Sequence, residues 1–153
     1  NLDNINSLVL DNISLPSICT SISFTLGFSS SNNSSNLYLN ESNNFHNLMF
    51  WPAVLGGGYH YLKLEGKYYN SNQEEQFYNT HTGSLNGVDY SFDYEFSIEE
   101  NNYNTIYLDM NINNFYNNPI YSFEEYGSGI MQNEAAQQSI FNNLNDVFSI
   151  ETN

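Results

Sequence analysis

Short runs of aromatic and β-branched residues, separated by clusters of Asn, Ser and Gly, recur along this chain. Such runs are typical of β-strands, and the polar clusters between them are typical of turns. They predict strands at about 21–28, 37–40, 59–69, 75–81, 88–98, 103–112 and 147–151. Many short strands indicate an all-β protein, and we expect an antiparallel Ig-like β-sandwich.

One segment has the spacing of a helix. Asn133 is a typical N-cap residue, and apolar residues follow it at helical intervals: Ala136, Ile140, Phe141 and Leu144. This pattern predicts one short C-terminal helix that lies on the sheet and leads into the last strand. The 153 residues suffice for one hydrophobic core but not for two, so residues 1–153 are expected to form a single domain.

The charge balance limits the partners of the protein. Two lysines, Lys63 and Lys67, oppose 17 acidic residues, which gives a net charge of -15. We therefore expect no binding to nucleic acid or to anionic membrane surfaces, both of which need basic patches. The acidic excess fits cations or, more simply, solubility in a salty medium. Carboxylates could bind Ca²⁺, but no EF-hand-type calcium loop is present.

Several classes of site are excluded by the residues that are missing. The single cysteine, Cys19, excludes an internal disulfide and any metal site built from several cysteines. The sequence contains no G-x-S-x-G, H-E-x-x-H, P-loop or Rossmann motif. We expect a binding protein and not an enzyme. No apolar run of about 18 residues is present, so no transmembrane helix is expected.

The segment 47–66 holds the densest group of functional candidates: the single tryptophan, Trp51, together with Met49, His60 and three consecutive glycines, Gly56 to Gly58. Glycines permit positive φ angles and close backbone approach, so they either position the start of the next strand or form a plain turn. His60 alternates with Leu62 and so should face the core, where its imidazole needs a hydrogen bond or a metal.

A second histidine, His81, ends the following predicted strand. If residues 59–69 and 75–81 form a hairpin with its turn at 70–74, His60 and His81 lie opposite each other near one end. Two imidazoles about 5 Å apart between Cβ atoms can share a metal ion. A thioether from Met131, or else from Met49, would favour copper, although Met131 could equally fill a gap in the core.

Four short runs carry a resemblance to a known family: Met49-Phe-Trp51, Gly57-Gly-Tyr59, Leu62-Lys-Leu-Glu-Gly66 and His81-Thr-Gly83. In this order they resemble the MbnP-like copper-binding proteins that methanotrophs and Bacteroidota export. Weaker matches at 106–110, 130–131 and 146–148 place the family-like core at about 21–151.

The resemblance implies an exported β-sandwich that binds copper, Cu⁺ or Cu²⁺, in the periplasm or at the cell surface. In related proteins a partner di-haem peroxidase oxidises a tryptophan to kynurenine, in or beside a copper site with histidine ligands. Trp51 matches the family tryptophan, which makes it a candidate modified residue or site neighbour. The resemblance also brings an outer-membrane protein complex into consideration as a partner.

Two hypotheses follow. The first is an exported, non-catalytic protein that captures or handles copper through His60, His81 and a thioether of Met131 or Met49. The second is an acidic surface module for adhesion or complex assembly, with structural histidines and Ca²⁺ as a stabilising ion. Exposed tyrosines such as Tyr68 or Tyr69 would favour the second. Metal analysis separates the two.

Overall fold

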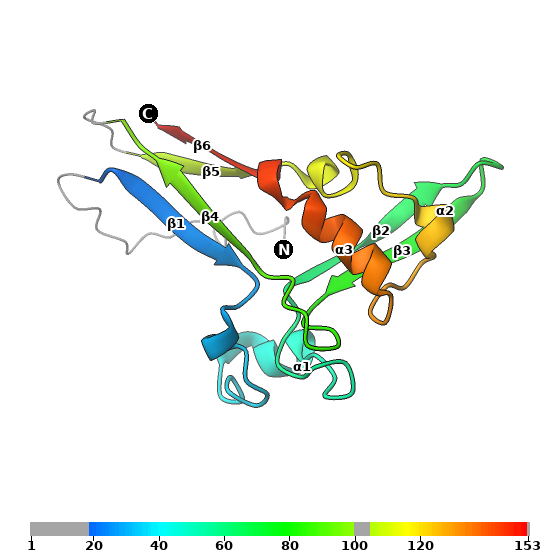
Figure 1. Ribbon diagram of the computed structural model, residues 1–153, viewed down its shortest axis with the longest axis horizontal. Coiled ribbons are helices and arrows are strands. Elements are labelled where there is room, and N and C mark those ends of the chain that lie inside the picture. Colours follow the sequence, from blue (N-terminus) through cyan, green and yellow to red (C-terminus); the bar gives the residue numbers. More distant parts are fainter. Residues whose placement is uncertain (1–18, 100–104, 153) are drawn as a thin grey trace.

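Antiparallel strands dominate the computed structural model, which describes residues 19–99 and 105–152 (Figure 1). Its strands are β1 (Ser21–Leu26), β2 (Leu62–Tyr69), β3 (Glu75–Thr82), β4 (Phe92–Ser97), β5 (Ile106–Met110) and β6 (Phe148–Thr152). They pair as three two-stranded sheets, β1–β4, β2–β3 and β5–β6. The strand-rich antiparallel class is confirmed, whereas these separate ribbons do not confirm the Ig-like β-sandwich.

The helices are short. They are α1 (Phe45–Met49), α2 (Phe123–Tyr126), α3 (Glu134–Asn142) and the 3₁₀ turns η2 (Ser30–Asn32), η3 (Ser42–Asn44), η4 (Ile112–Tyr116) and η5 (Leu144–Asp146). Helix α3 is the predicted one, and the Asn133 side chain caps it by accepting a hydrogen bond from the Ala136 amide at 3.1 Å. The expectation of a single helix is wrong, because α1 and α2 are too short to show helical periodicity.

Two other strand predictions need comment. Residues 37–40 form turns, because Leu37 and Glu41 donate their amides to carbonyls three residues earlier, those of Ser34 and Tyr38. Local hydrogen bonds there replace a strand ladder. The start of the predicted strand 103–112 lies outside the described residues, and its remainder contains β5 and the beginning of η4.

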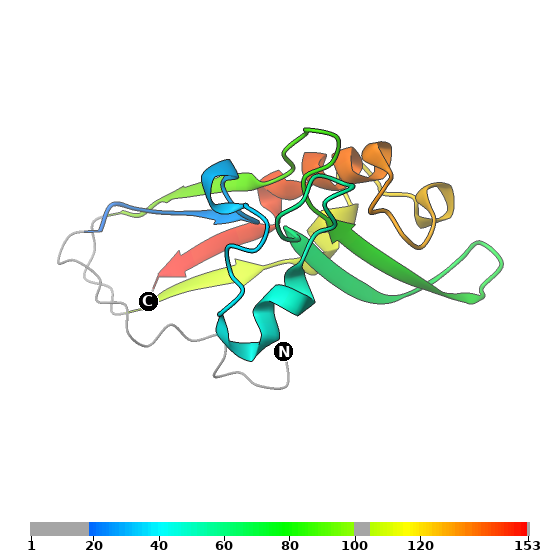
Figure 2. The ribbon, with the colours of Figure 1, turned by 90° about the horizontal axis from the view of Figure 1, so that it is seen from below.

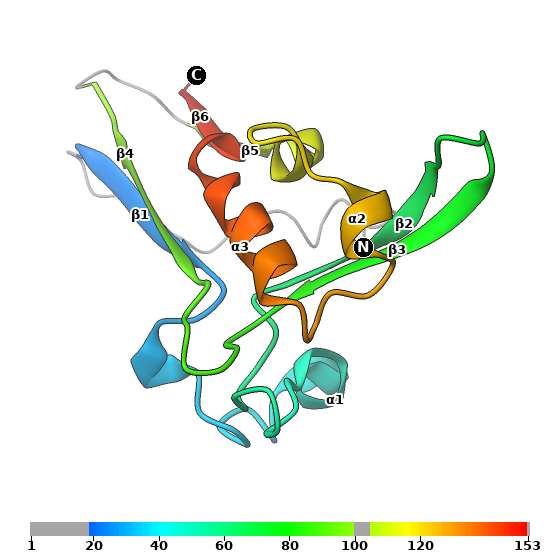
Figure 3. The ribbon, with the colours of Figure 1, turned by 45° about the vertical axis from the view of Figure 1, so that its right-hand side comes forward.

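The main hydrophobic core forms around α3, which lies between the β1–β4 ribbon and the β2–β3 ribbon (Figures 1 and 3). Ile140 and Leu144 are almost fully buried there, and Leu26 of β1 and Leu64 of β2 pack against the same cluster. Burial of each such side chain contributes about 1.5–3 kcal/mol. A single helix thus holds ribbons together that share no strand pairing with each other.

A second core cluster lies at the base of the β2–β3 ribbon, and its buried members are Trp51, Leu55, Tyr61, Leu85 and Tyr90. The fully buried Gln137 of α3 connects this cluster to the helix. Its side-chain amide donates to the Met131 carbonyl at 3.0 Å, and its side-chain oxygen accepts from the Gly83 amide at 3.3 Å.

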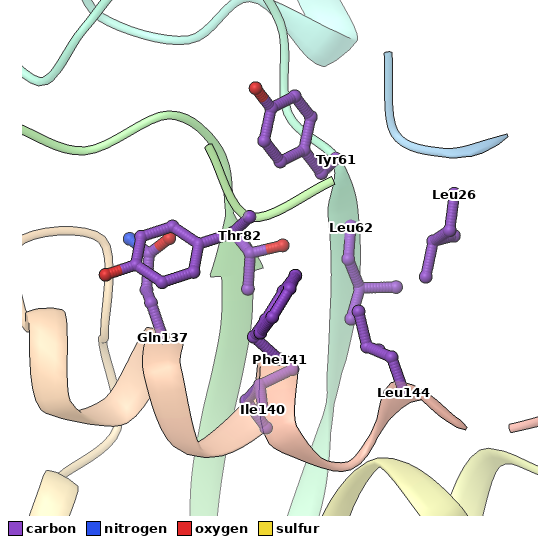
Figure 4. Close-up of a pocket in the computed structure, with 9 residues that line it drawn as sticks. Leu26, Tyr61, Leu62, Thr82, Gln137, Ile140, Phe141 and Leu144 are labelled. Carbon is purple, nitrogen blue, oxygen red and sulfur yellow. The ribbon is translucent and has the colours of Figure 1, made fainter. Parts of the chain in front are cut away.

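A small cavity of about 10 Å³ lies between α3, the last residue of β1 (Leu26) and the first residue of β2 (Leu62) (Figure 4). Leucine, isoleucine and aromatic side chains line most of it, together with Thr82 and Gln137. A space of this size holds about one water molecule, so it is too small for an organic ligand.

Helix α2 packs against the β2–β3 hairpin, where Phe123 stacks on Tyr68 with 4.8 Å between ring centres, and the turn of the hairpin projects away from α1 (Figure 2). Its turn closes at the predicted place, where the Asn70 amide donates to the Glu74 carbonyl at 3.0 Å. Lys63 is the Cα partner of His81 in the ladder, so the predicted pairing of residue 60 with residue 81 is wrong by three positions. No helix in the part of the chain that the structure describes is long and apolar enough to cross a membrane.

Gly83 should be sensitive to substitution because its α-carbon lies against the Trp51 ring. A Cβ added to Gly83 would stand 2.5 Å from Trp51 Cδ2, closer than two carbon atoms can approach. We expect Gly83→Ala to lower the free energy of unfolding by about 1–3 kcal/mol, measured by urea denaturation. Gly129→Ala is the control, since no atom of residues 19–99 or 105–152 lies within 4 Å of a Cβ there. Equal stability of the two variants would contradict this packing.

Candidate metal centre

Two backbone hydrogen bonds between residues 49–51 and 58–60, together called the clasp, position the candidate residues. The His60 amide donates to the Met49 carbonyl at 2.7 Å, and the Trp51 amide donates to the Gly58 carbonyl at 2.9 Å. Phe50 and Tyr59 form an isolated antiparallel bridge between these two bonds. The clasp fixes the end of α1 beside the segment that leads into β2.

The triple glycine makes the clasp sterically feasible. Gly57 and Gly58 adopt φ angles of 75° and 87°, which are strained for residues with a side chain. A Cβ on Gly58 would also stand 2.5 Å from the Asn33 carbonyl oxygen. Both interpretations of the glycines apply, because the Gly56 and Gly57 amides close a turn on the Ala53 and Pro52 carbonyls, while Gly58 allows the close approach to Asn33.

Trp51 forms the inner wall of the site. Its side chain is fully buried, and its indole N–H donates to the Ser84 carbonyl at 2.6 Å. The ring stands edge to face against the His60 imidazole, with 4.8 Å between ring centres and 88° between planes. The tryptophan that matches the family motif therefore contacts a candidate metal ligand directly.

His60 is 6% exposed, so its predicted burial is present, but the alternation behind that prediction is not, because Tyr59 and Tyr61 are buried as well. Its Nδ1 lies 3.0 Å from the Met49 carbonyl oxygen. A carbonyl only accepts hydrogen bonds, so Nδ1 carries the proton and Nε2 carries the lone pair. Nε2 is buried and has no hydrogen-bond partner within the described part of the chain. This atom is a strong indication of a bound ligand, because buried polar atoms are rarely left unpaired.

The protonation state of His60 also suits a metal ligand. Burial lowers the pKa of His60 below its ordinary value of 6.5, and the nearby charge of Lys63 adds to this lowering. The hydrogen bond to Met49 acts in the opposite direction without reversing the shift. The imidazole is therefore neutral near pH 7, as metal coordination requires.

His81 lies beside His60. The two rings are edge to face at 86°, with 5.2 Å between their centres. His81 Nε2 lies 2.7 Å from Glu65 Oε1, and the His81 side chain is 15% exposed. The predicted proximity is therefore present, although its reason differs. His60 precedes the first residue of β2, Leu62, so the chain has left the ladder before it reaches His60.

The spacing of the rings fits one shared ion. With metal–nitrogen bonds of about 2 Å, two imidazoles on one ion have ring centres about 5–6 Å apart. The observed 5.2 Å lies in this range. Across residues 19–99 and 105–152, no group of three or more His, Cys, Asp or Glu residues could hold a metal. A complete site would thus need donors of another class beside the two imidazoles.

The two methionines that are candidate thioether ligands, Met49 and Met131, make different contacts at this centre. Met49 contributes its main-chain carbonyl to both nitrogen donors of His60, the amide and Nδ1. Met131 is partly buried and packs against the cluster that contains Trp51. Coordination by either sulfur stays a prediction. The third histidine, His46, is bound through Nδ1 to the Tyr59 hydroxyl at 3.0 Å.

A period-2 pattern over residues 59–65 predicts Tyr59, Tyr61 and Glu65 on the solvent face of the strand, and it assigns no role to Glu65. The structure agrees with the face, since the Glu65 side chain is 58% exposed, but brings its carboxylate to His81. Tyr59 and Tyr61 were expected on that same face and are instead buried. Both precede β2 and are covered by other segments; Phe28 and Tyr38, for example, pack on Tyr59.

His60 should make the stability of the metal-free protein depend on pH. Its pKa is lower in the folded state than the ordinary value of 6.5, so the unfolded state binds more protons as the pH falls through that value. Its stabilising contribution is present above pH 6.5 and is lost below it. We expect the free energy of unfolding to fall less between about pH 7.5 and pH 5.5 in His60→Asn than in the parent, by urea denaturation.

The control for this experiment is Asn72→Ala, an exposed position without a titratable group, which should retain the pH dependence of the parent protein. An unchanged pH dependence in His60→Asn would show that His60 does not titrate at a lowered pKa in the folded state.

Comparison with known proteins identifies the family. The family model described as MbnP matches residues 3–141, which is most of the chain. No curated protein and no solved structure shows a significant match. The matched range includes Trp51, His60, His81 and Met131. The chain therefore belongs to the MbnP family.

Proposed function

We propose that this protein binds copper as cargo outside the cytoplasm and has no catalytic activity. His60 Nε2 and a nitrogen of His81 would be the imidazole donors, with a thioether from Met131, or else from Met49. The observation that carries the proposal is the buried Nε2 of His60, which has no hydrogen-bond partner among the described residues and lies beside a second imidazole ring. Membership of the MbnP family supports it.

The donor set favours copper over harder ions. Imidazole suits copper and zinc, whereas a thioether is a soft ligand that selects Cu(I). Calcium and magnesium need several oxygen ligands, which neither the imidazoles nor the thioethers supply. A capture protein also benefits from a partly exposed ligand, and His81 is more exposed than the buried His60.

We also propose export to the periplasm or cell surface and a peroxidase-like or outer-membrane partner, and the family resemblance supports both. Trp51 would then be oxidised to kynurenine by that di-haem partner. Its contact with His60 at 4.8 Å supports this proposal, because a modified ring at this position would border the metal.

Loss of the two imidazoles should abolish copper binding. We expect about one copper per chain in the parent protein after loading with Cu(I) and gel filtration, measured by elemental analysis. A His60→Ala, His81→Ala double variant should retain almost none, and His81→Ala alone should bind more weakly. Circular dichroism checks that each variant is folded, and His46→Ala is the matched control. Copper retention by the double variant at the parent level would refute this ligand assignment.

The state of Trp51 can be read directly from protein isolated from its own cells. We expect a mass change on the peptide that contains Trp51, by tandem mass spectrometry of a digest. The same peptide from protein expressed without the oxidising partner should keep the mass of tryptophan. An unmodified Trp51 in copper-loaded native protein would contradict the proposed modification and leave the copper site unaffected.

The second candidate function is an acidic surface module for adhesion or assembly. The observation in its favour is the exposure of Tyr69 and Phe77, at 69% and 64%, on the β2–β3 ribbon. Exposed aromatic side chains are common in protein and glycan interfaces. This function predicts no copper, or only weakly bound Ca²⁺, so the elemental analysis above also separates it from the first.

A further inference from the structure

We propose that Glu65 is the positioning residue of the metal centre and that it makes His81 bind copper through Nδ1. This inference rests on the proposed function. The contact that carries it is the 2.7 Å distance between Glu65 Oε1 and His81 Nε2. The copper ligand itself is His81, and Glu65 acts only through the imidazole.

The sheet register explains why these two side chains meet. His81 pairs with Lys63, and Glu65 pairs with Asn79, so Glu65 and His81 are diagonal neighbours on the outer face of the ribbon. Burial alternates along β2, with Lys63 and Glu65 on the exposed side. A long acidic side chain at this diagonal position reaches the ring directly.

The chemistry of the pair fixes the tautomer of His81. An ionised carboxylate only accepts hydrogen bonds, so Nε2 must carry the proton that is shared with Glu65. In the neutral imidazole this leaves the lone pair on Nδ1. His60 has the opposite arrangement, because the Met49 carbonyl holds the proton on Nδ1 and leaves the lone pair on Nε2.

In both rings, therefore, the nitrogen that would not bind the metal donates a hydrogen bond. Metal-binding histidines usually have such a bond. Such a bond orients the ring, selects the tautomer and raises the basicity of the ligating nitrogen. For His60 the acceptor is main chain and cannot be removed by substitution. For His81 it is the Glu65 side chain, 58% exposed, which can be replaced without disturbing the core.

The predicted effect is on copper binding and not on folding. Loss of an outer-shell partner typically weakens metal affinity by 10–100-fold. An exposed ion pair contributes little to stability, so Glu65→Ala should remain folded. Its copper affinity, measured by competition with a Cu(I) chelator, should fall by about 10–100-fold.

The control is Glu75→Ala. Glu75 is also a surface glutamate of this ribbon, with a 46% exposed side chain, but it pairs with Lys67 at 2.6 Å near the turn. Its loss removes the same charge from the same face and leaves His81 unchanged. Glu75→Ala should bind copper as tightly as the parent. An equal loss of affinity in both variants would attribute the effect to general charge and would overturn the proposal.

A second measurement does not require copper. Long-range proton–nitrogen NMR spectra of the metal-free protein at about pH 8, above the ordinary imidazole pKa, report the tautomer of each histidine. We expect His81 to be protonated on Nε2 in the parent and in Glu75→Ala, and to become a mixture of tautomers in Glu65→Ala. The same tautomer at His81 in all three proteins would overturn the role of Glu65.

The outcomes distinguish this inference from the function on which it rests. A parent protein that binds no Cu(I) would refute the proposed function, and the role of Glu65 in copper binding would fall with it. A parent that binds Cu(I) as tightly as Glu65→Ala would refute only the role of Glu65.

Discussion

The hydrogen bonds between His60 and the Met49 carbonyl are the interaction on which this centre depends. One carbonyl oxygen accepts from both the His60 amide and Nδ1, so the backbone and the ring are fixed together. This leaves Nε2 buried, and no residue that the structure describes uses its lone pair. A protein that only needed to fill this space could use an apolar side chain without the cost of desolvating an imidazole. The unused lone pair therefore argues for a ligand.

Most of the surrounding fold can be understood as support for this clasp. Gly57 and Gly58 allow the chain to turn within a few residues, and Trp51 fills the space behind His60. Gln137 connects Gly83 and Met131 to helix α3, so the main core and the wall of the centre share one buried side chain. Because its acceptor and its neighbours belong to the packed interior, His60 is held rigidly in a single orientation.

The local parts of this arrangement could be predicted from the sequence. The cap at Asn133 and the turn at 70–74 each follow from a few neighbouring residues. The ladder register could not be predicted, because a hairpin with a five-residue turn permits several pairings and the chain leaves the ladder before residue 60. The two rings met nevertheless, through a bend at residues 60–61 that has no periodic signal.

Assembly of the strands was harder to predict than their positions. Alternation shows that a strand has one buried face, but it does not show what covers that face. Here the α3 helix lies between two ribbons, where a sandwich would place a second sheet. Glu65 was overlooked for a related reason. An exposed glutamate looks like a solvated charge until the pairing of the strands shows that His81 is its diagonal neighbour.

Charge and ligand softness would make separate contributions to copper capture. The net charge of -15 attracts every cation. The negative electrostatic potential around the protein raises the local concentration of calcium and magnesium as well as of copper. It therefore increases the rate of encounter without selecting a metal, and salt weakens it. Selection would come from the imidazoles and a thioether, which bind copper far better than they bind hard ions. Burial increases from Glu65 through His81 to His60, so in the proposed site an ion would meet the partly exposed imidazole of His81 before the buried one of His60.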